Sequence, residues 1–312
     1  MIFEPQSFKS DTVPPNDSMK PSSAPPSVGS YEQLLITTHG ATDVGRIRER
    51  NEDQFVIATL TGLLWIDQSS FQQPRFQCGG PRGHLMVVAD GMGGHVGGDE
   101  ASALAVGTIE NFVLGALGWL LDLTSPGDTL LDELKNALRR ADATVTAAAQ
   151  SQPRSRAMGT TLTLAYAYED VLYLAHVGDS RCYLSRGGRL TQLTRDHTIV
   201  GELVAAGVLK AEEAKDSRMR HVVTNVVGGG TPKVTVELHR LPLTAGDVVL
   251  LCTDGLNDMV SDEQIQRTIA ERVEPEAIVN QLVSDAVMLG GVDNVTVVAS
   301  RFTPATARNS VH

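Results

Sequence analysis

The sequence predicts an α+β fold built on antiparallel sheets, and two observations support this prediction. Short segments rich in β-branched and aromatic residues follow one another as hairpins, separated by glycine-rich turns. Strands and helices do not alternate regularly, as they would in a parallel sheet. The expected strands lie near residues 33–40, 53–60, 84–90, 160–168, 171–178, 181–186, 233–241, 246–254 and 294–302.

Two long helical segments are expected after the first three strands. The first runs from about Asp99 to Leu123, and the second from about Thr129 to Gln150. In the second, LLDELKNALRRADATV repeats apolar residues at the spacing of one helix face. Pro126-Gly127 divides the two segments, and further helices are expected within residues 262–289.

The domain prediction places one folded domain at residues 31–303, because motifs that belong to one site occur near both of its ends. Residues 1–30 are rich in Pro and Ser and are expected to form a disordered tail. Residues 304–312 form a short C-terminal tail. Within the domain, residues 198–230 combine short helical pieces, a basic stretch and three glycines, which predicts a mobile flap. A Gln/Gly/Pro-rich insertion between Leu60 and His84 suggests no chemistry.

Composition excludes several classes of protein. The formal net charge of −11 argues against a nucleic-acid partner, which would need a basic face. Cys78, Cys182 and Cys252 are odd in number and widely spaced, which favours a reducing compartment, the cytoplasm. The longest apolar stretch, from Phe112 to Leu121, is far shorter than the ~20 residues of a membrane span.

Acidic residues at the ends of apolar runs predict a metal site. VVADG ends in Asp90-Gly91 and LLCTDG ends in Asp254-Gly255, so each carboxylate stands at the mouth of a buried strand. A following glycine lets the backbone approach a bound ion closely. Glu52-Asp53 and Asp293 extend the set. Carboxylates suit hard Mg²⁺ or Mn²⁺, whereas no His/Cys cluster with zinc spacing occurs.

Seven segments then carry a resemblance to a known family. They occur in order between about residues 40 and 302: GRIRERNED, VVADGMGGH, MGTTLTLA, AHVGDSR, LTRDH, CTDGLNDMV and GGVDNVTVV. Together they resemble the metal-dependent protein phosphatases (PPM), the type 2C serine/threonine phosphatases, and ADGMGGH is similar to the bacterial branch. The resemblance implies a four-layer sandwich of two antiparallel β-sheets flanked by helices, with a small flap subdomain. It also implies hydrolysis of phosphoserine and phosphothreonine by a water activated at a dinuclear Mg/Mn centre.

The resemblance also assigns roles to metal ligands. Asp90 would bridge both ions, and the carbonyl of Gly91 would bind one of them. Asp254 and Asp293 would bind the other ion. Asp179, in VGDSR, would support a third and weaker ion together with Asp254. From the residues alone, Asp179 could equally end an ordinary hairpin as the partner of Arg181.

Further roles implied by the resemblance concern phosphate and protons. Glu52 and Asp53 match acids that hold metal-bound water or the metal itself, and the sequence leaves open which one is a ligand. Arg48 matches an arginine that grips phosphate, for which a guanidinium fork is well suited. Met92 stands where animal relatives carry a histidine acid. His95, or water on the third ion, would then protonate the leaving group.

Residues outside this set have weaker interpretations. The basic stretch Ser217 to His221, with Arg218 and Arg220, is either a solvated face or a substrate contact at the edge of the flap. His176 is expected to be a satisfied core histidine. His197 is expected to order the loop before the flap. Thr160 and Thr161, at a strand start, are expected to be structural.

The resemblance implies phosphorylated proteins as substrates and a serine/threonine protein kinase as the antagonist. Two rival interpretations remain open at this point. A catalytically silent relative would bind phosphoproteins as a regulator, but it would lack metal ligands. A phosphohydrolase for small molecules or for one dedicated regulator would have the same chemistry and a different flap.

Overall fold

The structure is a computed structural model. It describes residues 34–65, 76–93, 97–117, 126–151, 158–210, 213, 217, 219–229 and 234–305. All of these residues belong to one compact unit that spans residues 32–312. The expected tail at 1–30, nearly all of the C-terminal tail, His95 and Arg218 lie outside the described residues.

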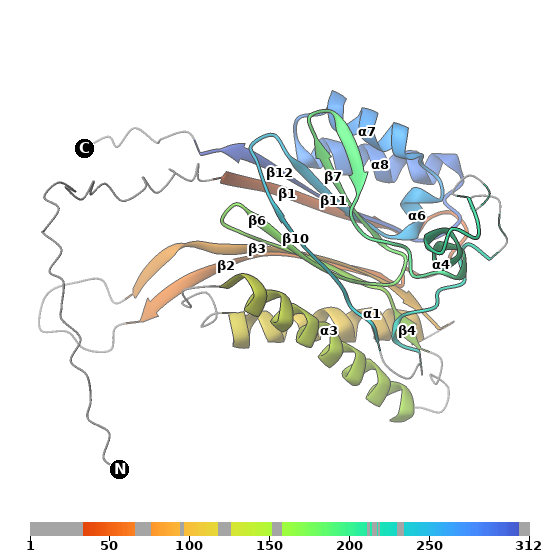
Figure 1. The fold of residues 1–312 in the computed structure, drawn as a ribbon, viewed down its shortest axis with the longest axis horizontal. Helices are drawn as coiled ribbons and strands as arrows, with labels where there is room; N and C mark the ends of the chain where they lie inside the picture. Colours follow the sequence, from red (N-terminus) through yellow and green to blue (C-terminus); the bar gives the residue numbers. More distant parts are fainter. Residues whose placement is uncertain are drawn as a thin grey trace, which may run out of the picture. The chain divides into compact units, whose positions relative to one another are not determined.

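The first sheet is antiparallel and has the strand order β1-β12-β11-β7-β8. Its central strand, β11, is buried along its whole length. β1 comes from the start of the described chain and β12 from its end, so the two ends of the domain share one sheet (Figure 1). The strands are β1 (Leu34–Asp43), β7 (Arg181–Arg186), β8 (Arg189–Gln192), β11 (Val248–Cys252) and β12 (Val295–Pro304).

The second sheet has the order β10-β6-β5-β3-β4-β9, and β2 pairs with β3 in addition. All of its described pairings are antiparallel, as the hairpin pattern of the sequence predicts. The strands are β2 (Asp53–Trp65), β3 (Phe76–Met92), β4 (Gly159–Thr160), β5 (Leu162–Tyr168), β6 (Val171–Val177), β9 (Val227–Gly228) and β10 (Glu237–Pro242).

Helices cover the outer face of each sheet. Figure 1 shows α1 and α3 beside the sheet that contains β3, and α7 and α8 beside the sheet that contains β12. The helices are α1 (Gly97–Phe112), the π-helical turn η1 (Val113–Leu117), α3 (Pro126–Ser151), α4 (Ile199–Ala205), α6 (Asp254–Asn257), α7 (Asp262–Glu271) and α8 (Pro275–Leu289).

Alternation along the strands builds three separate hydrophobic cores. In β3, Val87 packs with α1 and α3, whereas its neighbour Val88 packs between the sheets. In β11, Leu250 faces α7 and α8, and Leu251 faces the other sheet. Successive side chains of a strand point to opposite faces, so both sheets bury both faces. The predicted four-layer sandwich is therefore confirmed.

Three details differ from the expectation or refine it. The insertion at 60–84 is largely ladder, because β2 and β3 remain paired as far as Trp65 and Phe76. The α-helical part of the first long helix ends at Phe112, and a π-helical turn follows in which Gly115 lowers the helix propensity. The expected end at Leu123 lies outside the described residues. Pro126 begins α3, a position where the missing backbone N–H of proline costs nothing.

The inter-sheet core can be tested at Phe302, which is fully buried on β12 between the two sheets. Phe302→Ala is expected to lower the free energy of unfolding by about 3–5 kcal/mol, because it removes apolar contacts and leaves a cavity. Urea denaturation measures this change. The exposed Val273 provides a control, and Val273→Ala should change stability by less than about 0.5 kcal/mol. Equal effects of the two substitutions would contradict this core.

Candidate metal centre

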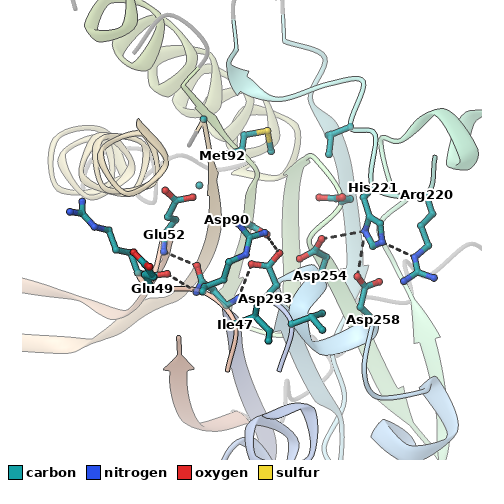
Figure 2. A pocket seen from close by; sticks show the side chains of 18 residues that line it. Ile47, Glu49, Glu52, Asp90, Met92, Arg220, His221, Asp254, Asp258 and Asp293 are labelled. Carbon is teal, nitrogen blue, oxygen red and sulfur yellow. Dashed lines mark hydrogen bonds and ion pairs between the residues drawn. The ribbon is translucent and has the colours of Figure 1, made fainter. Parts of the chain in front are cut away.

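Carboxylates from five chain segments meet at one end of the sandwich. Asp53 begins β2, and Asp90 lies near the end of β3. Asp179 stands between β6 and β7, and Asp254 begins α6 directly after β11. Asp293 lies two residues before β12. Figure 2 shows Asp90, Asp254 and Asp293 around a common pocket.

Asp53 and Asp90 are opposite one another in the β2–β3 ladder. The hydroxyls of Thr253 and Thr296 both donate to Oδ2 of Asp53, at 2.8 and 2.7 Å. Oδ1 of Asp53 is buried and has no hydrogen-bond partner. One oxygen of this carboxylate is therefore fixed by the first sheet, and the other remains able to bind a cation.

Thr160 and Thr161 fix the backbone of Asp90. The backbone N–H of Thr161 and the hydroxyl of Thr160 each donate to the Asp90 carbonyl at 2.9 Å. The hydroxyl of Thr161 accepts from the Asp90 N–H, also at 2.9 Å, and contacts the hydroxyl of Ser180. Both threonines have structural roles, as predicted, because their hydrogen bonds fix the position of Asp90.

Gly91 lies where no other residue fits. Its N–H donates to the carbonyl of Glu52, and a Cβ at this position would stand 2.0 Å from the carbonyl oxygen of Gly98. A side chain here would force apart β2, β3 and the start of α1. The backbone of Gly91 can thus lie at the floor of the pocket, where its carbonyl is able to bind an ion.

Asp254 and Asp293 are placed by tight packing between α6 and the start of β12. A Cβ at Gly255 would stand 1.9 Å from the carbonyl oxygen of Asn294. Asn294 donates to the carbonyls of Val44 and Arg50, each at 2.9 Å, and thereby holds the β1–β2 loop against this segment. Oδ1 of Asp254 is buried without a hydrogen-bond partner.

Asp179 does not form the hairpin pair that its sequence allowed. Arg181 instead makes a bidentate ion pair with Asp196, with N–O distances of 2.9 and 2.6 Å. Asp179 is buried, and burial together with the charges of Asp254 and Asp196 raises its pKa to about 8. Its carboxylate therefore belongs electrostatically to the acidic cluster.

Burial and mutual repulsion disfavour full ionisation of the cluster. Burial raises the pKa of Asp53 to about 7, against the two threonine hydrogen bonds that lower it. Burial and the charges of Asp53 and Asp254 raise the pKa of Asp90 well above its usual value. Each of these carboxyl groups therefore ionises fully beside its charged neighbours only when a cation lies close to it. The two unpartnered oxygens and the all-oxygen ligand set fit Mg²⁺ or Mn²⁺.

Arg48 and Glu52 lie at the edge of the same pocket. A terminal nitrogen of Arg48 donates to Oδ2 of Asp293 at 2.6 Å, and about half of the Arg48 side chain is exposed. Glu52 lines the pocket, but its carboxylate packs over the N-terminus of α1. A Cβ at Gly98 would stand only 2.6 Å from it. Of the two adjacent acids, Asp53 is the more deeply buried in the cluster.

The pocket has a volume of about 830 Å³ and is open toward the region predicted as the flap. Met92 lines it and carries no proton to donate. Arg220 lines the opposite side, as the substrate-contact interpretation requires. Asn225 of that region donates to the Thr235 carbonyl, which joins the end of the predicted flap to the strand that follows.

The sequence analysis assigned no individual role to two residues of the pocket, His221 and Asp258. His221 lies with its Nδ1 3.4 Å from Asp258 Oδ2 and 3.8 Å from Asp254 Oδ2 (Figure 2). Asp258 stands four residues after Asp254, so the two carboxylates share one helix face. That spacing, in DGLND, was the available signal for Asp258. Nothing local in the sequence indicated the contact with His221.

A second cluster surrounds His176, which is fully buried as predicted. Its ring contacts the Thr163 hydroxyl and the carbonyls of Gly178 and Arg195. His197 accepts from the Gly178 N–H through Nδ1 and contacts Glu237 through Nε2. Backbone bonds from His197 to Gly178 and Thr224 then tie the Asp179 turn to residues 222–225. His197 thus orders this loop, as predicted.

The family is decided by a match to known sequences. The family model described as Protein phosphatase 2C matches residues 62–284, which include Asp90, Asp179 and Asp254. The chain belongs to this family. Within it, the chain is 30% identical over 256 residues to the serine/threonine phosphatase stp of Listeria monocytogenes, covering 82% of this chain and 92% of that protein.

A longer relative and two solved structures are also similar. The serine/threonine protein phosphatase PstP of Mycobacterium tuberculosis is 38% identical over 216 residues, which are 69% of this chain and only 40% of that protein. Its crystal structure superposes with a TM-score of 0.69 at 34% identity, covering 86% of this chain and 99% of that one. The crystal structure of the catalytic domain of a serine/threonine protein phosphatase PstP in complex with two manganese ions superposes with a TM-score of 0.67 at 33% identity, with the same coverage.

Like its phosphatase 2C relatives in these superpositions, the chain has two antiparallel sheets with flanking helices. Among the described residues, no helix combines the length and the apolar character that crossing a bilayer requires.

The pH dependence of stability tests the burial of His176. Burial and the neighbouring His197 lower its pKa to about 4, so the folded protein keeps this ring neutral. The contribution of the neutral ring to the free energy of unfolding is fully present above about pH 6.5. It is lost as the pH falls toward 4, by roughly 3 kcal/mol in total. In EDTA, His176→Gln should therefore show a smaller loss of unfolding free energy over this range than the unsubstituted protein.

The comparison between the unsubstituted protein and His176→Gln is necessary because the carboxyl groups of the metal centre act in both proteins. They change the free energy of unfolding with pH in the opposite direction to His176. Their raised pKa values mean that the folded state binds more protons than the unfolded state, which favours folding at lower pH. Chemical denaturation at a series of pH values gives the difference. Parallel pH profiles would show that His176 does not titrate as described.

Proposed function

We propose that this chain is a metal-dependent serine/threonine protein phosphatase, which hydrolyses phosphoserine and phosphothreonine in other proteins. The observation that supports the proposal most strongly is a set of five buried or half-buried aspartates that line one open pocket beside Arg48, with the buried Asp53 opposite Asp90 in the adjoining ladder. The five are Asp90, Asp179, Asp254, Asp258 and Asp293. Membership of the phosphatase 2C family and the names of the similar proteins agree with it.

We assign Asp90, the Gly91 carbonyl, Asp254 and Asp293 to metal binding. Asp90 would contact both of two Mn²⁺ or Mg²⁺ ions, the Gly91 carbonyl would bind one of them, and Asp254 and Asp293 would bind the other. Asp53 supports this set, and Asp179 with Asp254 would hold a third ion. When bound, such ions supply Lewis-acid stabilisation of the phosphoryl group and activate the attacking water. The threonine and asparagine contacts hold the ligands in place beforehand.

Arg48 is assigned to the phosphate. Its guanidinium shares a half-exposed ion pair with Asp293, so exchange of this partner for a phosphate oxygen costs little. A planar fork of donors can bind two phosphate oxygens at once. Arg220 and, in the basic stretch, Arg218 are assigned to the more distant parts of a phosphoprotein.

The leaving alkoxide needs a proton that Met92 cannot give. Water in the pocket is the donor we propose, and His95 is the alternative, although it lies outside the described residues. Glu52 is assigned to orienting such water at the start of α1 rather than to direct metal binding, because its carboxylate packs against Gly98.

The cellular setting completes the proposal. A serine/threonine protein kinase would be the antagonist, since a phosphatase of this class needs a source of phosphorylated proteins. Cys182 and Cys252 are buried free thiols on adjacent strands, and they face different cores, so they cannot bond to each other. Free thiols agree with a reducing compartment, the cytoplasm.

Metal-dependent turnover tests the proposal. Asp254→Asn should lower kcat/KM for a phosphothreonine peptide at least about 100-fold, because it removes one of the metal-binding carboxylates. Asp132→Asn, on the exposed face of α3, makes the same chemical change away from the pocket and should leave turnover unchanged. Turnover should also stop in EDTA and return with Mn²⁺. Metal-independent hydrolysis, or full activity of Asp254→Asn, would refute the assignment.

Arg48→Lys tests the phosphate contact. It keeps the positive charge but loses the second parallel hydrogen bond, so KM for a phosphopeptide should rise about tenfold, with a smaller change in kcat. Steady-state kinetics at saturating Mn²⁺ separate the two parameters. An unchanged KM would show that Arg48 serves only as the ion-pair partner of Asp293.

A further inference from the structure

Exposed apolar side chains are concentrated on two segments, each of which contributes one residue to the lining of the metal pocket. Among the described residues, eleven large hydrophobic side chains are exposed, and five of them lie on two short segments, 44–47 and 288–292. We call these five residues the apolar shelf. The apolar shelf consists of Val44 (36% exposed), Ile47 (69%), Met288 (70%), Leu289 (54%) and Val292 (47%).

Hydrogen bonds join the two segments to each other and to the core. The Arg46 N–H donates to the Gly291 carbonyl at 2.7 Å, and the Gly291 N–H donates to the Ala286 carbonyl of α8. Asn294 donates to the carbonyl of Val44 at 2.9 Å. At Gly45, where φ is +78°, a Cβ would stand 2.3 Å from the carbonyl oxygen of Asp293. The exposed side chains thus project from a fixed backbone.

The apolar shelf adjoins the residues assigned to the phosphate and the metals. Ile47 and Val292 both line the pocket, and each is next in sequence to one member of the Arg48–Asp293 ion pair. Figure 2 shows Ile47 beside Asp293 at the pocket. Neighbouring Cα atoms are about 3.8 Å apart, and an extended substrate advances about 3.3 Å per residue. Because Ile47 also lines the pocket, a substrate residue near the phosphorylated one can contact it.

Much of the remaining pocket rim is charged. Glu49, Arg50, Arg220 and Asp258 line it together with the metal-binding acids. Exposure of a cluster of apolar side chains to water is unfavourable, and these residues do not pack in the hydrophobic core. Such a cluster is typical of an interaction site. Across the pocket, Val223 lines it near Arg220, and the exposed Met219 and Val222 are their neighbours in sequence.

We propose that the apolar shelf selects substrates, by binding an apolar side chain within two residues of the phosphorylated serine or threonine. The occupant is an extended segment of a phosphorylated protein, because a ligand held by its phosphate at Arg48 is brought into the pocket that Ile47 and Val292 line. A rigid shelf favours this occupant further, since little freedom is lost when it binds. This inference rests on the phosphatase activity proposed above.

Peptide kinetics test the proposal. The substrates are phosphothreonine peptides that are identical except for Leu or Ser at one position, scanned from two residues before to two residues after the phosphothreonine. If the apolar shelf binds substrate, Leu raises kcat/KM by about tenfold over Ser at one position at least. This ratio is at the low end of what apolar pockets achieve. Hydrolysis of para-nitrophenyl phosphate, which has no flanking residues, is measured in parallel.

Variants of the shelf then locate the effect. Ile47→Ser should reduce the Leu/Ser ratio at that position to within about twofold, whereas Ile47→Leu should retain it. Val273→Ser is the matched control, because Val273 is 70% exposed and lies just before the first residue of α8. The shelf residue Leu289 is the last residue of that helix, roughly 20 Å away along its axis. Since Ile47 is exposed, its replacement leaves the folded core intact, which thermal unfolding verifies.

The outcomes separate this inference from the proposed function. If neither the peptides nor para-nitrophenyl phosphate are hydrolysed in Mn²⁺, the proposed function itself fails. If both are hydrolysed but no position prefers Leu, or if Ile47→Ser keeps the preference, the apolar shelf is not a substrate site. Sedimentation that shows a dimer dissociated by Ile47→Ser, without altered peptide selectivity, would instead assign the shelf to self-association and overturn the proposal.

Discussion

Repulsion among buried carboxylates is the constraint on which the arrangement of this site depends. Asp53, Asp90 and Asp179 are held in a protein interior that raises the pKa of each, and their neighbours' charges raise it further. A protein keeps such a cluster only where the surrounding structure fixes it. Here the cluster stands at the end of the sandwich, where loops from both sheets converge and where the pocket opens to solvent.

For Asp53 and Asp90, the fixing contacts come from uncharged groups rather than from ion pairs. Thr253 and Thr296 hold one oxygen of Asp53, and Thr160 and Thr161 hold the backbone of Asp90. Because these groups carry no charge, they position the carboxylates without neutralising them. The ligand set thereby keeps its attraction for divalent cations, and Oδ1 of Asp53 and Oδ1 of Asp254 have no hydrogen-bond partner.

The sequence predicts the parts of this structure that depend on local pattern. Continuous apolar runs in β3 and β11 indicated buried strands, and Asp90 and Asp254 were recognisable because each ends such a run. Contacts between distant segments were not predictable in this way. Asp258 pairs with His221 across the pocket, and Asn294 ties down a loop about 250 positions earlier in the chain. No local propensity encodes such contacts, and the continuation of the β2–β3 ladder through the insertion was missed for the same reason.

The central claim is that this acidic cluster, and no other group in the described chain, is the main binding site for divalent cations. Anomalous diffraction from a crystal soaked in Mn²⁺ tests it most directly, because the map shows where the ions lie without reference to activity. The account predicts two strong peaks that share Asp90, one beside the Gly91 carbonyl and one beside Asp254 and Asp293. A map whose strongest peak lies at His176, His197 and Glu237, or that has no peak at Asp90, would contradict it.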